Sequence, residues 1–139
     1  AERFLDSYRR HPAGTEHGHF VRPVVLTGVN ADDPIAQQEV FGPVLAVLRT
    51  DSYDHAVAIA NGTEYGLSAG IVTSDLARAF DFARRIDSGV VKVNLPTTGV
   101  AMNAPFGGIK NSSTQTFKEQ AGDTMMHFYT VDKTVYLSA

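Results

Sequence analysis

Apolar positions in the first half of the chain predict two strands separated by a polar stretch. Residues 21–27 are rich in β-branched side chains and predict a short strand, with Pro23 near an end or an edge. Residues 45–49 form an almost continuous apolar run. A run of that length is typical of a parallel strand that is covered on both faces.

Apolar residues at helical spacing predict two helices. The first begins after Ser52, a suitable N-cap, and ends before Gly62. Its apolar face consists of Tyr53, Ala56, Val57 and Ala60. The second begins after Asp75 and is stopped by Gly89. Its apolar face consists of Leu76, Ala79, Phe80, Ala83 and Ile86.

Two further apolar segments, 68–73 and 90–94, alternate with these helices. From residue 45 onward the order is therefore strand, helix, strand, helix, strand, with short connections. This order favours right-handed crossovers, which place the strands parallel in one sheet. The predicted class is α/β, with a parallel βαβαβ sheet that is covered by helices.

The last third of the chain has a different character. Residues 95–115 are rich in Gly, Pro, Asn and Ser and follow the end of a predicted parallel strand, a place where α/β proteins bind ligands. A helix is predicted over 118–126, although Gly122 weakens the pattern. Residues 129–137 alternate in polarity and predict a terminal strand, whose backbone groups need a neighbour.

Composition narrows the class of protein. A chain of 139 residues with 43% hydrophobic content can form one domain, and a net charge of −3 without a basic stripe argues against nucleic-acid binding. No apolar run approaches the ~18 residues that span a bilayer. The absence of cysteine excludes disulfides and makes a cytoplasmic location the default expectation. Because the chain begins with Ala1 instead of Met, we expect a processed, engineered or truncated product.

Glu39 is the first candidate for chemistry, because Phe41, a turn and a predicted parallel strand follow it. An ionised carboxylate accepts hydrogen bonds from both hydroxyls of a ribose, and acids recur near nucleotide sugars for this reason. Phe41 could pack beside the same ligand. The alternative is a solvated glutamate before a structural turn, and the pattern alone favours this alternative.

Five phrases, in order along the chain, resemble the aldehyde dehydrogenase superfamily. They are E-x-FGPV at 39–44, N-x-T-x-YGL at 61–67, a strand that follows Gly89 and ends in Val-Asn at 94, PFGG-x-K-x-S at 105–112, and an aromatic-Tyr-Thr-x-x-Lys-Thr strand at 128–134. The NLPTTG loop, the paired serines at 112–113 and Glu119-Gln120 are most similar to the α-ketoglutaric semialdehyde dehydrogenase branch. The chain departs from that branch after the serines, where it reads TQTFKEQ and relatives usually carry a Gly and an Arg.

The resemblance implies roles for four residues. Glu39 would bind the nicotinamide ribose of NAD or NADP, and Phe41 would flank the nicotinamide end. Asn94 and Phe106 would belong to the substrate channel and its supporting loop. The implied substrate is an aldehyde, either a small acidic semialdehyde or a generic aliphatic aldehyde, which is oxidised to a carboxylic acid.

No catalytic residue is expected in this chain. In the family the nucleophilic cysteine, the oxyanion asparagine, the general-base glutamate and the dinucleotide-binding half all precede the E-x-FGPV segment. Residues 1–125 would then be the C-terminal part of the catalytic domain, inactive alone, and residues 126–139 a strand that extends a partner's sheet in a homodimer or homotetramer. The alternative is a non-catalytic assembly or interaction module that uses the same strand.

Other patterns carry less weight. His17 and His19, with His11 nearby, supply two zinc-ligand candidates and an uncertain third, which favours surface histidines over a metal site. The segment 107–112 does not fit a phosphate loop, because the lysine of that loop directly follows a glycine. Lys110 could attract a substrate carboxylate, but a lysine in a glycine-rich loop is more often solvated.

Overall fold

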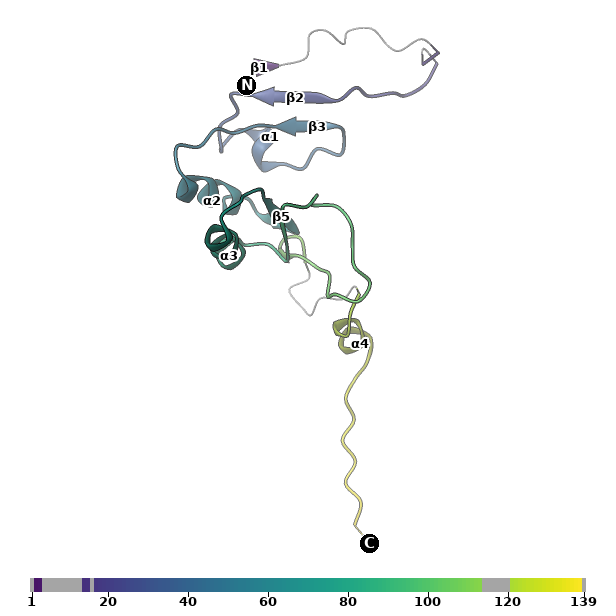
Figure 1. The fold of residues 1–139 in the computed structure, drawn as a ribbon. Helices are drawn as coiled ribbons and strands as arrows, with labels where there is room; N and C mark the ends of the chain where they lie inside the picture. Colours follow the sequence, from purple (N-terminus) through teal and green to yellow (C-terminus); the bar gives the residue numbers. More distant parts are fainter. Residues whose placement is uncertain (1, 4–13, 16, 114–120, 139) are drawn as a thin grey trace. The chain divides into compact units, whose positions relative to one another are not determined.

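The computed structural model describes residues 2–3, 14–15, 17–113 and 121–138 (Figure 1). The chain divides into two units, Ala1–Thr63 and Glu64–Ala139, and each unit is described by itself. Among the helices of the described residues, none has the length and apolar character that crossing a membrane requires.

Unit 1 is built around a three-stranded sheet. Its elements are β1 (Glu2–Arg3), β2 (Val24–Thr27), α1 (Pro34–Gln37), β3 (Val44–Ala46) and α2 (Tyr53–Asn61). The strand order is β1-β2-β3, with β1 antiparallel and β3 parallel to β2. In the parallel pair Val24 lies opposite Val44. The strands predicted at 21–27 and 45–49 are therefore confirmed, with different bounds.

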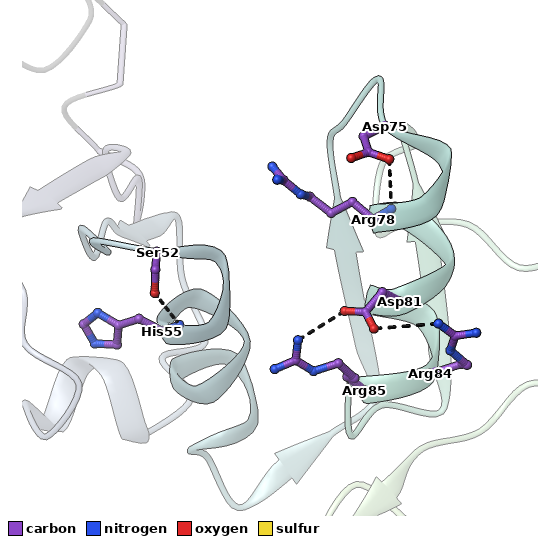
Figure 2. A network of polar contacts seen from close by, with 7 residues as sticks. All are labelled: Ser52, His55, Asp75, Arg78, Asp81, Arg84 and Arg85. Atoms are coloured by element: carbon purple, nitrogen blue, oxygen red, sulfur yellow. Dashed lines mark hydrogen bonds and ion pairs between the residues drawn. The ribbon is translucent and has the colours of Figure 1, made fainter.

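Helix α2 forms where the apolar spacing and the flanking residues predict it. The Ser52 hydroxyl accepts a hydrogen bond from the His55 backbone N–H at 3.1 Å (Figure 2). At the other end Gly62 follows the last helical residue, and its N–H donates to the Ile59 carbonyl at 3.0 Å. Val57 is buried, so the helix and the centre of its inner face are confirmed. Ala60, on the rim of that face, is exposed.

Unit 2 contains two separate ladders. Its elements are β4 (Tyr65–Gly66), β5 (Ser68–Ile71), α3 (Leu76–Arg85), β6 (Val90–Val93), β7 (Ile109–Lys110) and α4 (Thr124–Tyr129). β5 and β6 are parallel and are connected through α3, with Ser68 opposite Val90. β4 and β7 are antiparallel, with Gly66 opposite Ile109. The strand, helix, strand crossover predicted from the sequence is present in β5, α3 and β6.

The expected single sheet is described only in parts, because its strands fall in two units. The sequence predicts that 45–49, 68–73 and 90–94 lie in one parallel sheet. Within unit 1 β3 pairs with β2, and within unit 2 β5 pairs with β6. The joining of these ladders in one sheet stays a prediction. An apolar run identifies a strand but does not name its neighbours, which long-range contacts select. The α/β class, with parallel strands and intervening helices, is confirmed.

Helix α3 begins where it is predicted, and it buries Ala79 and Ile86 of the predicted face but not the other three residues. Its N-cap Asp75 accepts a hydrogen bond from the Arg78 N–H at 3.1 Å, and Figure 2 shows this contact at the first turn. The buried residues of the helix and its C-cap are Ala79, Phe82 and Ile86. The expected face also included Leu76, Phe80 and Ala83, which are exposed, so that part of the prediction is wrong. The helix carries two apolar stripes, and only packing decides which one is covered.

The last turns of α3 also correct the role of Gly89. The helix ends at Arg85 with Ile86 as its C-cap, and Asp81 pairs with Arg85 at 3.2 Å on the outer side (Figure 2). Gly89 is three residues further on, and its N–H donates to the Gly66 carbonyl at 3.0 Å. Gly89 therefore serves the contact between strands and does not stop the helix.

The C-terminal region begins with a helix where a strand was expected. Phe128 and Tyr129 belong to α4, and their rings meet edge to face with centroids 4.9 Å apart. The helix predicted over 118–126 falls partly on residues 118–120, which lie outside the described residues. Residues 130–138 form no strand in the structure. A strand requires a partner for its backbone, so pairing of this segment with a partner subunit stays a prediction.

Candidate functional site

Glu39 and Phe41 lie in the segment that connects α1 to β3. The end of this segment is tied to the sheet, because the Val24 N–H donates to the Pro43 carbonyl at 2.8 Å. This bond lies beside the first residue pair of the parallel ladder between β2 and β3. The sheet therefore holds the segment by its backbone and leaves its side chains available.

The side chains of this segment are presented outward. Phe41 is 94% exposed and its neighbour Val40 is 48% exposed. Glu39 is exposed as well. A carboxylate can accept hydrogen bonds from two hydroxyls, and an aromatic face can pack against a flat ring. Both groups are thus presented to solvent, and their part in binding a cofactor stays a prediction.

In unit 2 the side chain of Asn94 joins the carboxyl ends of β5 and β6. Its amide oxygen accepts a hydrogen bond from the Thr73 N–H at 2.8 Å, and its amide nitrogen donates to the Thr73 carbonyl at 2.9 Å. The Asn94 backbone N–H donates to the Ile71 carbonyl at 2.8 Å. Asn94 has a φ of +53°, in the left-handed region that asparagine tolerates better than most residues. The chain therefore turns sharply as it leaves β6.

The segment after Asn94 is held by the same two strands. The Ser68 hydroxyl donates to the Thr97 carbonyl at 3.2 Å, and the Lys92 ammonium donates to the Gly99 carbonyl at 3.3 Å. Ser68 lies in β5 and Lys92 lies in β6. Residues 95–99 thus return along the strand pair instead of leaving it, and Thr97 lies at Ser68, the first residue of β5.

A second loop, which carries Phe106, packs closely on the start of β6. A Cβ atom added to Gly89 would lie 1.9 Å from the Gly107 carbonyl oxygen, so the two backbones touch. Gly107 is buried, and Phe106 is partly buried. Further along, the Ser112 hydroxyl accepts a hydrogen bond from the Gly66 N–H at 3.1 Å. The glycines and the serine of the PFGG-x-K-x-S phrase therefore anchor the loop from both sides of β7.

Two polar pairs join this loop to other segments of unit 2. The Asn111 amide donates to the Glu64 carboxylate at 2.8 Å. The Lys110 ammonium lies 3.7 Å from the Asp87 carboxylate, and the Lys110 side chain is 25% exposed. The expectation of a solvated Lys110 is therefore wrong, because the lysine side chain folds onto the unit and pairs with an acid.

The four residues implied by the resemblance fall in two units. Glu39 and Phe41 belong to unit 1, whereas Asn94 and Phe106 belong to unit 2. Within unit 2, Asn94 and Phe106 lie on two loops that are both anchored to β6 or its flanking residues. The joining of both pairs into one pocket stays a prediction.

Sequence reasoning missed the contacts that support these loops. The Ser68 and Ser112 hydroxyls act on backbone groups 29 and 46 residues away, and the Asn94 side chain acts on the Thr73 backbone 21 residues away. No periodic pattern connects positions so far apart. The one local signal was an asparagine at the end of a predicted strand, since asparagine tolerates the left-handed conformation.

Metal binding finds no support among the described residues. No group of three or more His, Cys, Asp or Glu side chains is placed there to hold an ion. His17 and His19 are exposed. His11 lies outside the described residues.

Residues 2–135 match the family model described as the aldehyde dehydrogenase family. Together with the crossover of β5, α3 and β6 and the anchored loops, this match identifies the class of protein. The chain belongs to the aldehyde dehydrogenase family.

Individual relatives refine the similarity. The chain is 53% identical over 121 residues to the α-ketoglutarate semialdehyde dehydrogenase of Haloferax volcanii. This alignment covers 87% of this chain and 25% of that protein. It is 48% identical over 98 residues to the succinate-semialdehyde dehydrogenase (NADP(+)) of Deinococcus radiodurans. That alignment covers 70% of this chain and 20% of that protein. The expected similarity to the α-ketoglutaric semialdehyde branch is confirmed.

A solved structure supports the fold. The aldehyde dehydrogenase of Mycobacterium tuberculosis, solved in complex with NAD+, superposes with a TM-score of 0.68 at 37% identity, over 73% of this chain and 21% of that chain. The chain therefore spans about a quarter of the length of the curated relatives it matches.

Proposed function

We propose that this chain is the C-terminal part of an NAD(P)-dependent enzyme that oxidises a small acidic semialdehyde to a carboxylic acid. The observation that carries the proposal is the 53% identity to an α-ketoglutarate semialdehyde dehydrogenase over most of the chain. The exposed Glu39 and Phe41 in one segment and the anchored loops of Asn94 and Phe106 support it.

Glu39 and Phe41 would hold the nicotinamide end of the cofactor. An exposed carboxylate two residues from a ring that is 94% exposed fits a ribose diol and the flat ring attached to it. When bound, the nicotinamide supplies the hydride acceptor. These two residues contribute orientation, because a displacement of ~1 Å between reacting carbons can lower the rate ~100-fold.

Asn94 and Phe106 would contribute the substrate side, as part of the channel and its supporting loop. The chain contains no cysteine, so the nucleophilic thiol of the proposed reaction would be supplied by other polypeptide. Residues 1–139 alone are therefore expected to bind NAD weakly and to oxidise no aldehyde. We assign 1–125 to the catalytic domain and 126–139 to subunit association in a homodimer or homotetramer. A cytoplasmic location stays a prediction from the sequence.

The proposal is tested by replacing Glu39 with Gln in the complete enzyme. The substitution keeps the size of the side chain but removes the charge that strengthens its hydrogen bonds. Hydrogen bonds to a charged group contribute about 1.5–3 kcal/mol, so we expect the rate of hydride transfer or the affinity for NAD to fall roughly 10- to 100-fold. Single-turnover formation of reduced cofactor measures the first quantity, and a fluorescence titration measures the second.

Asp32→Asn is the matched control, because Asp32 is an exposed acid of the same unit. It removes the same charge and is expected to leave both quantities unchanged. Normal single-turnover kinetics together with normal NAD affinity in Glu39→Gln would refute the ribose role.

The substrate and the choice of cofactor are decided by a screen on the complete enzyme. Acidic semialdehydes are compared with neutral aliphatic aldehydes of equal length, each with NAD and with NADP. We expect the highest kcat/KM for an acidic semialdehyde. Equal values for neutral aldehydes would favour a general aldehyde dehydrogenase.

The second candidate is a non-catalytic assembly module. The exposed apolar side chains of the C-terminal segment, such as Val131 at 94% and Leu137 at 93%, favour an association role. Reading the gene upstream of Ala1 separates the two candidates. An open frame that encodes a glycine-rich Rossmann turn and a cysteine supports the enzyme, whereas a start codon at this point supports the module.

A further inference from the structure

The hydrogen bonds of Asn94 continue the ladder between β5 and β6 beyond its last residue pair. Ile71 lies opposite Val93 at the end of the ladder. One step further, the Asn94 side chain meets the N–H of Thr73 at 2.8 Å and its carbonyl at 2.9 Å. The amide thus reproduces, with a side chain, the paired donor and acceptor of a backbone rung. It keeps the ends of β5 and β6 together at the point where the backbone turns away from each strand.

We propose that Asn94 is a positioning residue for the substrate side of the site, which acts through Thr73 and the 95–99 segment and not by contact with substrate. The inference rests on the proposed function. It changes the role of Asn94 in that function from substrate contact to support. The side-chain amide already forms hydrogen bonds through its oxygen and its nitrogen to the backbone of Thr73.

Asparagine suits this position for two independent reasons. Its amide offers one acceptor and two donor hydrogens, so it can serve an N–H and a carbonyl at once. Its backbone tolerates the observed φ of +53°, which most side chains resist. The turn sends residues 95–99 back along the strands, where Ser68 and Lys92 hold the Thr97 and Gly99 carbonyls.

The same bonds reach the start of α3. The Thr73 hydroxyl accepts a hydrogen bond from the Asp75 N–H at 3.1 Å, and the Asp75 carboxylate caps the helix at Arg78. A residue that holds Thr73 therefore holds the strand end, the helix start and the returning segment together. Loss of its side chain is expected to loosen all three.

The two roles of Asn94 are separated by Asn94→Gly and Asn94→Ala. Glycine adopts a positive φ without strain but has no amide, whereas alanine lacks the amide and resists the conformation. Asn94→Asp keeps one acceptor and tolerates the backbone, so it serves as the conservative variant. Asn103→Gly, at an exposed asparagine of the neighbouring loop, is the matched control.

Amide hydrogen exchange is measured first, on the full 139-residue chain. In Asn94→Gly we expect exchange at the hydrogen-bonded N–H groups of Thr73 and Asp75 to rise roughly 10-fold, with a smaller rise in Asn94→Asp and none in Asn103→Gly. Exchange in Asn94→Gly at the wild-type rate, with damage confined to Asn94→Ala, would show that only the backbone conformation matters and would overturn the proposal.

Steady-state kinetics of the complete enzyme follow. A displaced segment should raise the aldehyde KM by a similar factor of roughly 10 for every aldehyde, with the KM for NAD(P) unchanged. A loss confined to one chemical class of aldehyde, without faster exchange, would indicate direct contact and overturn the proposal. Failure of the wild-type enzyme to oxidise any aldehyde would overturn the proposed function and the substrate role together, whereas unchanged exchange in an active enzyme overturns this inference alone.

Discussion

Gly89 decides how closely the Phe106 loop approaches β6. A Cβ atom at this position would lie 1.9 Å from the Gly107 carbonyl oxygen and 2.9 Å from the Gly108 Cα. Both atoms belong to backbone, which cannot rotate aside as a long side chain can. The absence of a side chain at Gly89 is therefore a requirement of packing.

Gly89→Ala is expected to lower the free energy of unfolding by about 2–3 kcal/mol, because the loop must shift to admit the methyl group. Urea unfolding followed by circular dichroism measures the change. Gly42→Ala is the control, since a Cβ there would meet only the Val40 Cγ1 atom at 4.0 Å, and it should stay within about 0.5 kcal/mol of wild type. Equal stability of Gly89→Ala and wild type would contradict the close packing.

Helices α2 and α3 begin at side-chain caps that the sequence makes visible. Ser52 and Asp75 each accept a hydrogen bond from the backbone N–H three residues later, at 3.1 Å in both cases. The inner face is less visible, because α3 buries Phe82 and exposes Phe80. At this scale helix boundaries follow from local chemistry, and helix orientation follows from packing.

Asp75→Ala is expected to destabilise unit 2 by about 1 kcal/mol, since it removes the acceptor for the Arg78 N–H. Asp75→Asn keeps an oxygen in the same place and should recover most of the loss. Chemical denaturation of the three proteins under the same conditions gives the comparison. An alanine variant as stable as the asparagine variant would show that the cap contributes little.

At the scale of the whole molecule, the C-terminal segment after α4 exposes apolar side chains that a partner could cover. Val131, Tyr136 and Leu137 are each more than 90% exposed. An apolar, β-branched segment with free backbone groups lowers its free energy by joining the edge of another sheet. A second copy of the protein as that partner stays a prediction of the proposed function.

Deletion of residues 130–139, which spares α4, is expected to raise the monomer fraction of the complete protein in sedimentation velocity. The loss of backbone pairing and of buried apolar area both weaken association. A full-length variant with serine at Val131, Val135 and Leu137 keeps the backbone and should shift the equilibrium in the same direction by less. An unchanged sedimentation profile in both variants would rule out this segment as the interface.

The sequence by itself determined six of the described elements, because their signals are local, and it did not predict β1, α1, β4 or β7. Apolar runs located β2, β3, β5 and β6, helical spacing and caps located α2 and α3, and the ordered phrases identified the family. A strand or a capped helix is specified by residues within a few positions of one another, so a single pass along the chain can find it.

Only the tertiary structure decided which elements meet. It paired β5 with β6 and β4 with β7, and it placed the Asn94 amide on Thr73, 21 residues away. It also selected which apolar stripe of α3 is buried. These outcomes depend on contacts between segments that are distant in the sequence. The spacing of apolar residues within one segment does not show which other segment it will contact.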